Sequence, residues 1–193
     1  MKSIVVFCGS SEGYNEVYKD TAYELGAVFA ERNIHLIYGG GKVGLMGALA
    51  DGCLANKGKV TGVIPGFLKT KEVAHEGLTE MITVDTMHQR KMKMHELSDG
   101  ILAMPGGWGT MEELFEMMTW AQLGLHPKPV GVLNVNCFYS PLLAMLSAMT
   151  EEGFVKEVYR DMVLVSEDMF ELLEQMNNYD VPVVPKWITT QTT

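Results

Sequence analysis

A short apolar segment that runs into a glycine-rich turn constrains this chain more than any other feature. Residues 100–104 (GILAM) are apolar and few enough for an inner strand of a parallel sheet, and Pro105 ends that strand. The three glycines in residues 106–109 (GGWG) allow positive φ and a close approach of the backbone to a ligand. Thr110 is predicted to be the N-cap of the helix that follows. The free amides of such a helix start bind phosphate, which is the ligand we expect here.

The predicted helix after this turn carries two adjacent glutamates whose side chains should face different ways. Successive residues of an α-helix are about 100° apart, so Glu113 falls beside the apolar residues Met117 and Trp120. Glu112 and Glu116 fall on the opposite side, toward solvent. A carboxylate on a core-facing stripe is rarely buried without a partner, so Glu113 is a candidate functional residue. The alternative is that Glu113 caps the first turn of its own helix.

The net charge of −9 argues against nucleic acid or an anionic membrane as a partner, because Lys and Arg form no basic run. A phosphorylated small molecule stays open as a ligand, because a local site can be positive on an acidic protein. Cys8, Cys53 and Cys137 are scattered without a CxxC pair, which indicates a reducing compartment rather than a disulfide framework or a zinc cage. The sequence shows no signal-peptide pattern, and no apolar run approaches the roughly 18 residues of a membrane span. We therefore expect a cytoplasmic protein.

Short apolar runs alternate with amphipathic stretches along the chain, and this alternation predicts an α/β fold. We expect a single domain over residues 1–180 and a frayed tail over residues 181–193. Ligands of open α/β sheets sit at the carboxyl ends of the strands, so the turn 9–11 (GSS) after the first strand belongs to the ligand-binding edge. The predicted strands are 3–8, 34–38, 59–64, 81–84, 100–104, 130–134 and 162–165, and the predicted helices are 15–32, one ending near 56, 86–98, 110–122, 140–152 and 168–177.

A second glycine-rich turn, residues 39–47 (GGGKVGLMG), lies between the second predicted strand and a helix. Its first six residues match GxGxxG, which usually indicates a dinucleotide site. Two departures argue against NAD: the fingerprint belongs to the first strand, and the next strand ends without an acidic residue to hold a ribose. We favour a second backbone-amide cradle for a nucleotide or sugar phosphate, and the alternative is only a tight strand–helix crossing. The glycines of this secondary loop are Gly39, Gly40, Gly41 and Gly44.

Arg90 is predicted to point inward from the helix over residues 86–98. On the helical wheel it lies between Met94 and Leu97, which belong to the buried stripe. An inward guanidinium needs an anion, so we expect Glu113 or a substrate phosphate to bind it. The alternative is a solvated arginine whose stem covers apolar surface.

Other polar and sulfur-containing side chains give weaker signals. Residues 65–78 form a predicted polar loop at the sheet edge, where loops often carry function. The five histidines include no HxxxH or HxH pair, so each is expected to be a surface or capping residue, and no metal site is predicted. The fifteen methionines favour adaptable packing, and several on the helices over 86–98 and 110–122 could build a dimer face.

Residues 105–113 (PGGWGTMEE) match the motif PGGxGTxxE, and the chain is similar to the "Lonely guy" (LOG) family of cytokinin riboside 5′-monophosphate phosphoribohydrolases. The resemblance implies a modified Rossmann fold, with a doubly wound, mostly parallel sheet and helices on both faces, in a homodimer. It also implies hydrolysis of the N-glycosidic bond of an N6-substituted adenosine monophosphate, or of AMP itself, which releases the free base and ribose 5-phosphate without a cofactor. The resemblance runs from Val5 to about Val165, and its other segments are 39–47, 87–91 (MHQRK), 120–124 (WAQLG) and 128–131 (KPVG).

The resemblance also implies which residues form the site. Arg90 and Glu113 correspond to the catalytic pair, in agreement with the two helical wheels. For Thr119 the implied substrate-binding role conflicts with the helical wheel, which places it on the solvent side. It can reach a ligand only if another loop or a second subunit covers that side. Trp108 fills the variable position of the motif, and its bulk could alter the base pocket. The implied substrate-binding residues are Glu72, Arg90, Lys91, Gly106, Gly107, Trp108, Gly109, Thr110, Met111, Glu112, Glu113 and Thr119.

Two other functions have been connected with such sequences. The family is often labelled lysine decarboxylase, and nothing in this sequence supports the label, because it would need a pyridoxal phosphate site and a Schiff-base lysine. The rival is a non-catalytic carrier of a nucleotide or of molybdenum cofactor, since such carriers share a similar fold and similar glycine motifs. A catalytic carboxylate is superfluous in a carrier, so Glu113 on the apolar face favours the enzyme.

Overall fold

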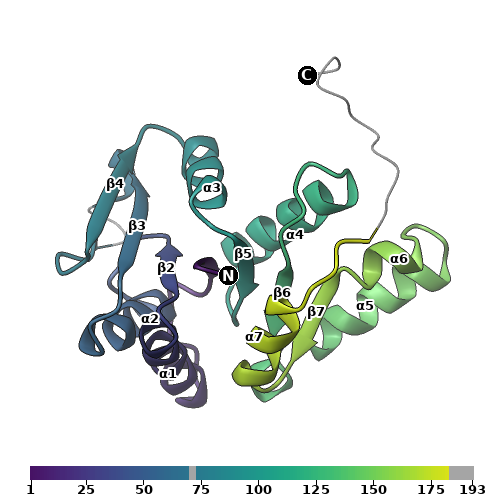
Figure 1. Cartoon of the computed structure of the whole chain (residues 1–193), viewed down its shortest axis with the longest axis horizontal. Coiled ribbons are helices and arrows are strands. Elements are labelled where there is room, and N and C mark those ends of the chain that lie inside the picture. The colour runs from purple at the N-terminus through teal and green to yellow at the C-terminus, as the bar shows by residue number, and fades with distance from the viewer. Residues whose placement is uncertain (70–72, 183–193) are drawn as a thin grey trace.

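The computed structural model describes residues 1–69 and 73–182, which contain a seven-stranded sheet flanked by helices (Figure 1). The strand order is β4-β3-β2-β1-β5-β6-β7, and all neighbouring strands run parallel. This arrangement confirms the predicted doubly wound α/β fold. The strands are β1 (Ser3–Phe7), β2 (His35–Tyr38), β3 (Val60–Pro65), β4 (Glu80–Val84), β5 (Gly100–Ala103), β6 (Val130–Leu133) and β7 (Val163–Ser166).

The burial of the strands explains why the sequence pattern located them. Every residue of β1, β3, β5 and β6 is buried, whereas the edge strands β4 and β7 are partly exposed. A parallel sheet that is covered on both faces requires apolar residues on both sides of its inner strands, and these appear as short continuous apolar runs. The predicted boundaries therefore agree with the observed strands to within about one residue, which is as close as boundary definitions allow.

Helices cover both faces of the sheet. Successive strand residues point to opposite faces, so Ile4 and Val6 of β1 pack with α1, α2 and α7, whereas Val5 and Phe7 pack with α3 and α4. The four-residue helix α6 was not predicted. The helices are α1 (Val17–Glu31), α2 (Gly44–Ala55), α3 (Met87–Glu96), α4 (Trp108–Gln122), α5 (Ser140–Glu151), α6 (Glu157–Arg160) and α7 (Met169–Asn177), with 3₁₀ turns at Gly66–Leu68 and Val135–Cys137.

The order of strand addition reverses between β1 and β5. Strands β2, β3 and β4 extend the sheet on one side of β1, and α3 then returns the chain to β5 on the other side (Figure 1). Open α/β sheets bind ligands at such a switch point, beyond the carboxyl ends of the strands. The turns that follow β1 and β5 meet there, because the amide of Gly9 donates to the carbonyl oxygen of Pro105 at 3.0 Å.

Some predictions concern segments that the structure does not describe. Glu72 belongs to residues 70–72, outside the described part of the chain. Of the predicted tail, 181–193, only Val181 and Pro182 are described. None of the helices within residues 1–69 and 73–182 is long and apolar enough to cross a membrane.

Candidate active site

A cavity of about 210 Å³ lies at the switch point. Its walls come from the carboxyl ends of β1 and β2, from α2 and α3, and from the turn that leads from β5 into α4. Arg90 and Glu113, from different helices, both line it, as the sequence predicted for a shared site. The lining residues are Val6, Phe7, Cys8, Ser10, Gly39, Met46, Met87, Arg90, Gly107, Trp108, Gly109, Thr110, Glu112 and Glu113.

The glycine turn forms one wall of the cavity, but its helix starts earlier than predicted. The N-cap of α4 is Gly107, which makes no side-chain capping bond, so the prediction of Thr110 as the N-cap is wrong. Thr110 lies in the first helical turn and is buried. A Cβ atom on Gly106 would stand 2.2 Å from Thr110 Oγ1 and 2.9 Å from Gly9 N, so the packed turn admits only glycine at this position.

The start of α4 nevertheless leaves backbone amides beside the cavity. The amide of Met111 donates to the carbonyl of Gly107 at 3.1 Å. The amides of Trp108, Gly109 and Thr110 lie before this first helical hydrogen bond. At these positions an α-helix has no carbonyl of its own that can accept from the amide. All three residues line the cavity. These amides, at a helix that begins after Gly107 rather than at Thr110, are the groups to which an anion could bind.

Arg90 is buried, with 5% of its surface exposed, which confirms the predicted inward orientation. Its Nε donates to the carbonyl of Val63 at 3.1 Å, and its Nη2 donates to the carbonyl of Gly39 at 2.7 Å. Val63 lies in the second half of β3 and Gly39 directly follows β2, so these carbonyls fix the guanidinium plane near the carboxyl edge of the sheet. A Cβ on Gly39 would come within 2.3 Å of Nη2, which explains the need for glycine there.

Glu113 faces the cavity from the second turn of α4. Because the helix begins at Trp108, Glu113 lies beyond the first turn and so beyond the position from which it could cap its own helix. It is half-buried, next to the buried Leu114 in the same turn. Burial raises the pKa of the nearby Cys8 thiol, and the charge of Glu113 raises it further. Cys8 is therefore a neutral, unreactive part of the wall.

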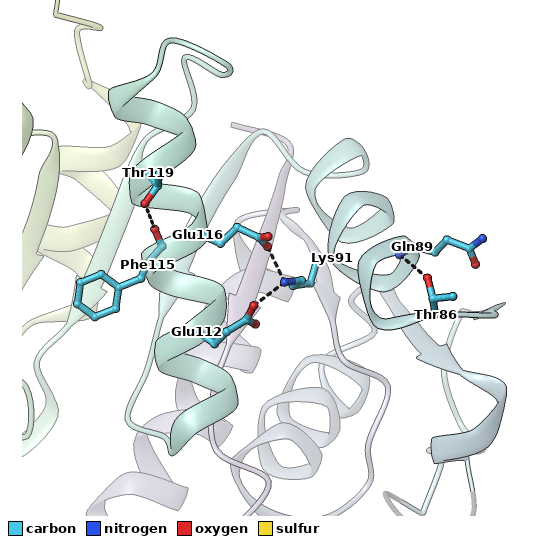
Figure 2. A network of polar contacts seen from close by, with 7 residues as sticks. All are labelled: Thr86, Gln89, Lys91, Glu112, Phe115, Glu116 and Thr119. Atoms are coloured by element: carbon cyan, nitrogen blue, oxygen red, sulfur yellow. Dashed lines mark hydrogen bonds and ion pairs between the residues drawn. The ribbon is translucent and has the colours of Figure 1, made fainter. Parts of the chain in front are cut away.

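Glu112 and Glu116 do not simply face solvent, in contrast to the helical-wheel prediction. Lys91, on α3, places its Nζ 2.5 Å from Glu112 Oε1 and 3.0 Å from Glu116 Oε2 (Figure 2). The side chain of Lys91 is only 7% exposed. A wheel describes one helix alone, and it cannot show that the neighbouring helix brings a cation to the polar side.

Several residues that the resemblance implied do not line this cavity. Thr119 is exposed and donates its hydroxyl to the carbonyl of Phe115 at 2.7 Å, one turn back on the same helix (Figure 2). Met111 packs against the core cluster around β5 and α4. Lys91 contributes only through its partner Glu112, which does line the cavity. Thr119 instead borders a separate groove between α4 and α5, together with Phe115 and Leu146.

The secondary glycine loop serves mainly as a tight strand–helix crossing. The amides of Leu45 and Met46, at the start of α2, both point to the carbonyl of Gly9, at 3.0 and 3.4 Å. Gly44 has φ +67°, and a Cβ there would stand 2.3 Å from the carbonyl carbon of Ser10. These amides are thus engaged within the protein, in contrast to the phosphate cradle that we favoured. Of Gly39, Gly40, Gly41 and Gly44, only Gly39 is among the residues that line the cavity.

The turn 9–11, which we placed at the ligand-binding edge, contributes Ser10 to the cavity wall. Cys8 and Met46 also line the cavity, and neither was named as a site residue from the sequence. His75 and His126 are buried rather than at the surface, and each caps a backbone amide two residues on, that of Gly77 and that of Lys128. His75 Nε2 lies 3.0 Å from Asp51 Oδ1, and His126 Nε2 lies 3.0 Å from the carbonyl of Met117, so each is satisfied by a tertiary partner.

The parallel sheet, its switch-point cavity and the helix start on the cavity wall define a Rossmann-type α/β protein with a cavity where such folds bind ligands. A sequence-family model described as "Possible lysine decarboxylase" matches residues 46–176. The cytokinin riboside 5′-monophosphate phosphoribohydrolase LOG1 of Arabidopsis thaliana is 46% identical over 178 residues, covering 92% of this chain and 84% of that protein. LOG2 of the same plant is 45% identical over 185 residues, covering 96% and 85%. The chain therefore belongs to the LOG family, as its motifs predicted.

Solved structures with the same fold include proteins of another function. A molybdenum cofactor binding protein from Rippkaea orientalis is 21% identical with a TM-score of 0.68, covering 92% of this chain and 99% of that one. The Moco carrier protein from Chlamydomonas reinhardtii is 20% identical with a TM-score of 0.67, covering 91% and 96%. At this level of identity the likeness shows the fold alone, because one fold can host unrelated functions.

Proposed function

We propose that this protein is a phosphoribohydrolase that cleaves the N-glycosidic bond of AMP or of an N6-substituted AMP. Water adds to C1′ of the ribose, the base leaves with a proton, and the products are the free base and ribose 5-phosphate. The observation that carries the proposal is the convergence of Arg90, Glu113 and the start of α4 on one cavity. The proposal is supported by the 46% identity to a protein named for this reaction.

The phosphate is assigned to the first turn of α4. The amides of Trp108, Gly109 and Thr110 and the positive end of the helix dipole suit a phosphate group. The distance from this turn to Glu113 is about one helical turn, which places the ribose beside the carboxylate when the phosphate is bound. A cavity of about 210 Å³ is smaller than typical sites for drug-sized ligands, so the base extends toward the exposed Trp108 at the mouth.

Glu113 is assigned the main chemical role. Ribosyl transfer to water passes through a state with positive charge on the sugar, and an ionised carboxylate next to the ribose stabilises that charge. The same carboxylate can orient the attacking water and accept its proton. Arg90 stays protonated at neutral pH, so it cannot be the base. Its guanidinium, held by two carbonyls, supplies a fixed positive charge in the same cavity as Glu113.

The direct test is release of free base. AMP, isopentenyladenosine monophosphate and the corresponding nucleosides are incubated with the protein, and free base and ribose 5-phosphate are quantified. We expect both products from the monophosphates and neither from the nucleosides. Tight binding of monophosphates without any base release would instead favour the carrier function.

The phosphate assignment makes Gly109→Ala informative. A Cβ on Gly109 would meet no atom within 4 Å, so the variant should fold normally and gain some helix propensity. The added methyl group stands beside the amides that we assign to phosphate, so affinity for AMP should fall by roughly tenfold, equivalent to about 1.4 kcal/mol. Calorimetry measures this loss. Adenosine, which lacks the phosphate, should bind to both forms equally, and an equal loss for both ligands would place the phosphate elsewhere.

We also propose that the protein is a homodimer that uses the surface near α3 and α4. Met92 is 44% exposed on α3, and Phe115, Met118 and Thr119 of α4 border an apolar groove. Met117 of α4 does not belong to this surface, because it is fully buried in its own chain. Light scattering at micromolar protein should give about twice the 21.4 kDa of one chain. A mass of one chain would reject the dimer. It would also reject the idea that a second subunit covers Thr119 and so allows it to contact a ligand.

The cellular setting proposed for this reaction is the cytoplasm. Cys8, Cys53 and Cys137 are all free thiols. Free thiols, two of them buried, suit a reducing compartment. The proposed ligand is a small phosphorylated molecule, and the net charge of −9 makes nucleic acid a poor partner.

A further inference from the structure

Lys91, Glu112 and Glu116 form a three-residue ionic cluster that joins α3 to α4 (Figure 2). The ammonium group of Lys91 lies 2.5 Å from Glu112 and 3.0 Å from Glu116, and 7% of its side chain is exposed. Burial acts to lower the pKa of Lys91, but the hydrogen bonds and charges of the two carboxylates outweigh it, so this pKa lies above its ordinary value. Lys91 therefore stays a cation, placed between the carboxylates of α4.

The position of the cluster connects it with the cavity. Arg90 and Lys91 are consecutive on α3, and Glu112 and Glu113 are consecutive on α4. Arg90 and Glu113 line the cavity, whereas Lys91 and Glu116 do not. The ion pair between Lys91 and Glu112 therefore joins the neighbour of Arg90 on α3 to the neighbour of Glu113 on α4. Any change in the separation of α3 and α4 would move Arg90 relative to Glu113.

We propose that Lys91 is a positioning residue, which sets the spacing of α3 and α4, and hence of Arg90 and Glu113, through its hydrogen bond to Glu112 and its ion pair with Glu116. This inference rests on the proposed hydrolase function for its catalytic consequence. It differs from the substrate-binding role that the resemblance implied for Lys91. A substrate contact would need the ammonium group to reach the ligand, but both carboxylates hold it between the helices.

Glu116 distinguishes the two roles because it binds Lys91 without lining the cavity. We expect Lys91→Met to lower kcat by about tenfold with less than a threefold change in KM, because small misplacements of reacting groups cost rate more than affinity. Glu116→Gln should lower kcat in the same way. The double variant should be no worse than Lys91→Met alone, since residues that act as a unit are not additive.

A matched control is Lys93→Met. Lys93 lies on the same helix, and its ion pair among the described residues is with Glu96 of that helix, at 3.7 Å, so its loss should leave kcat and KM unchanged. Hydrogen exchange of residues 108–113 gives a second readout that does not depend on activity. Lys91→Met should speed hydrogen exchange in this segment relative to Lys93→Met, because the first turns of α4 lose the ion pairs that connect them to α3.

The outcomes separate the inference from the proposed function. A large rise in KM for Lys91→Met, with Glu116→Gln unaffected, would overturn the positioning role in favour of a substrate contact. Unchanged exchange over 108–113 in Lys91→Met would also overturn it. If the wild type releases no base, the hydrolase proposal fails. Faster hydrogen exchange in Lys91→Met would in that case still support the role of Lys91 in holding α3 and α4 together.

Discussion

Glu113→Gln should lower kcat by roughly 10²-fold or more while KM changes little. The substitution keeps the shape of the side chain on the cavity wall and removes its charge. Without that charge, the positive sugar of the transition state loses its stabilising partner, and the attacking water loses its base. If substrate affinity comes mainly from a phosphate bound at the start of α4, as we propose, the ground state should be bound nearly as well as before. Steady-state kinetics with AMP measures the effect.

A suitable control for this variant is Glu24→Gln, an exposed glutamate on α1. It makes the same chemical change on a helix that contributes no residue to the cavity, so both kinetic constants should be unchanged. Glu112→Gln is not a neutral control, in contrast to the expectation from the helical wheel, because Glu112 binds Lys91. If Glu113→Gln kept kcat within a factor of about three, the assigned mechanism would be wrong.

Arg90→Lys is expected to have a comparably large effect although the charge is kept. Arg90 donates from two different nitrogens, to Val63 and Gly39, and these bonds hold the guanidinium plane in the cavity wall. A lysine ammonium is a single point of charge on a flexible stem, and it cannot make both bonds while facing the same place. We expect kcat/KM to fall by roughly 10²-fold, since misplaced reacting groups carry a cost of that order. Single-turnover kinetics with AMP would show whether the chemical step is slowed.

Arg32→Lys gives the matched comparison. Arg32 is an exposed residue at the end of α1, with its guanidinium 5.5 Å from the centre of the Phe170 ring. This conservative change should leave kcat/KM unchanged. Thermal unfolding of both variants shows whether a loss of activity reflects loss of fold. If Arg90→Lys retained full activity, the two carbonyl bonds would be irrelevant to the reaction.

The sequence by itself determined the strands, most helices and the central motif. Inner strands of a parallel sheet must be apolar on both sides, so β1 and β5 could be located from short apolar runs. Glycines mark places where a side chain cannot fit, and Gly39 and Gly106 proved to be such positions. The inward orientation of Arg90 followed from the helical period, which depends only on residues close in sequence.

Only the tertiary structure decided which groups those residues meet. Helix periodicity placed Glu112 toward solvent, but Lys91, 21 residues earlier, lies on the neighbouring helix and binds it. Likewise, the amides at the start of α2 looked available for a phosphate, and the carbonyl of Gly9 accepts from them instead. Hydrogen bonds and ion pairs act over a few ångströms, so partners distant in sequence become known only when packing has fixed the elements that carry them.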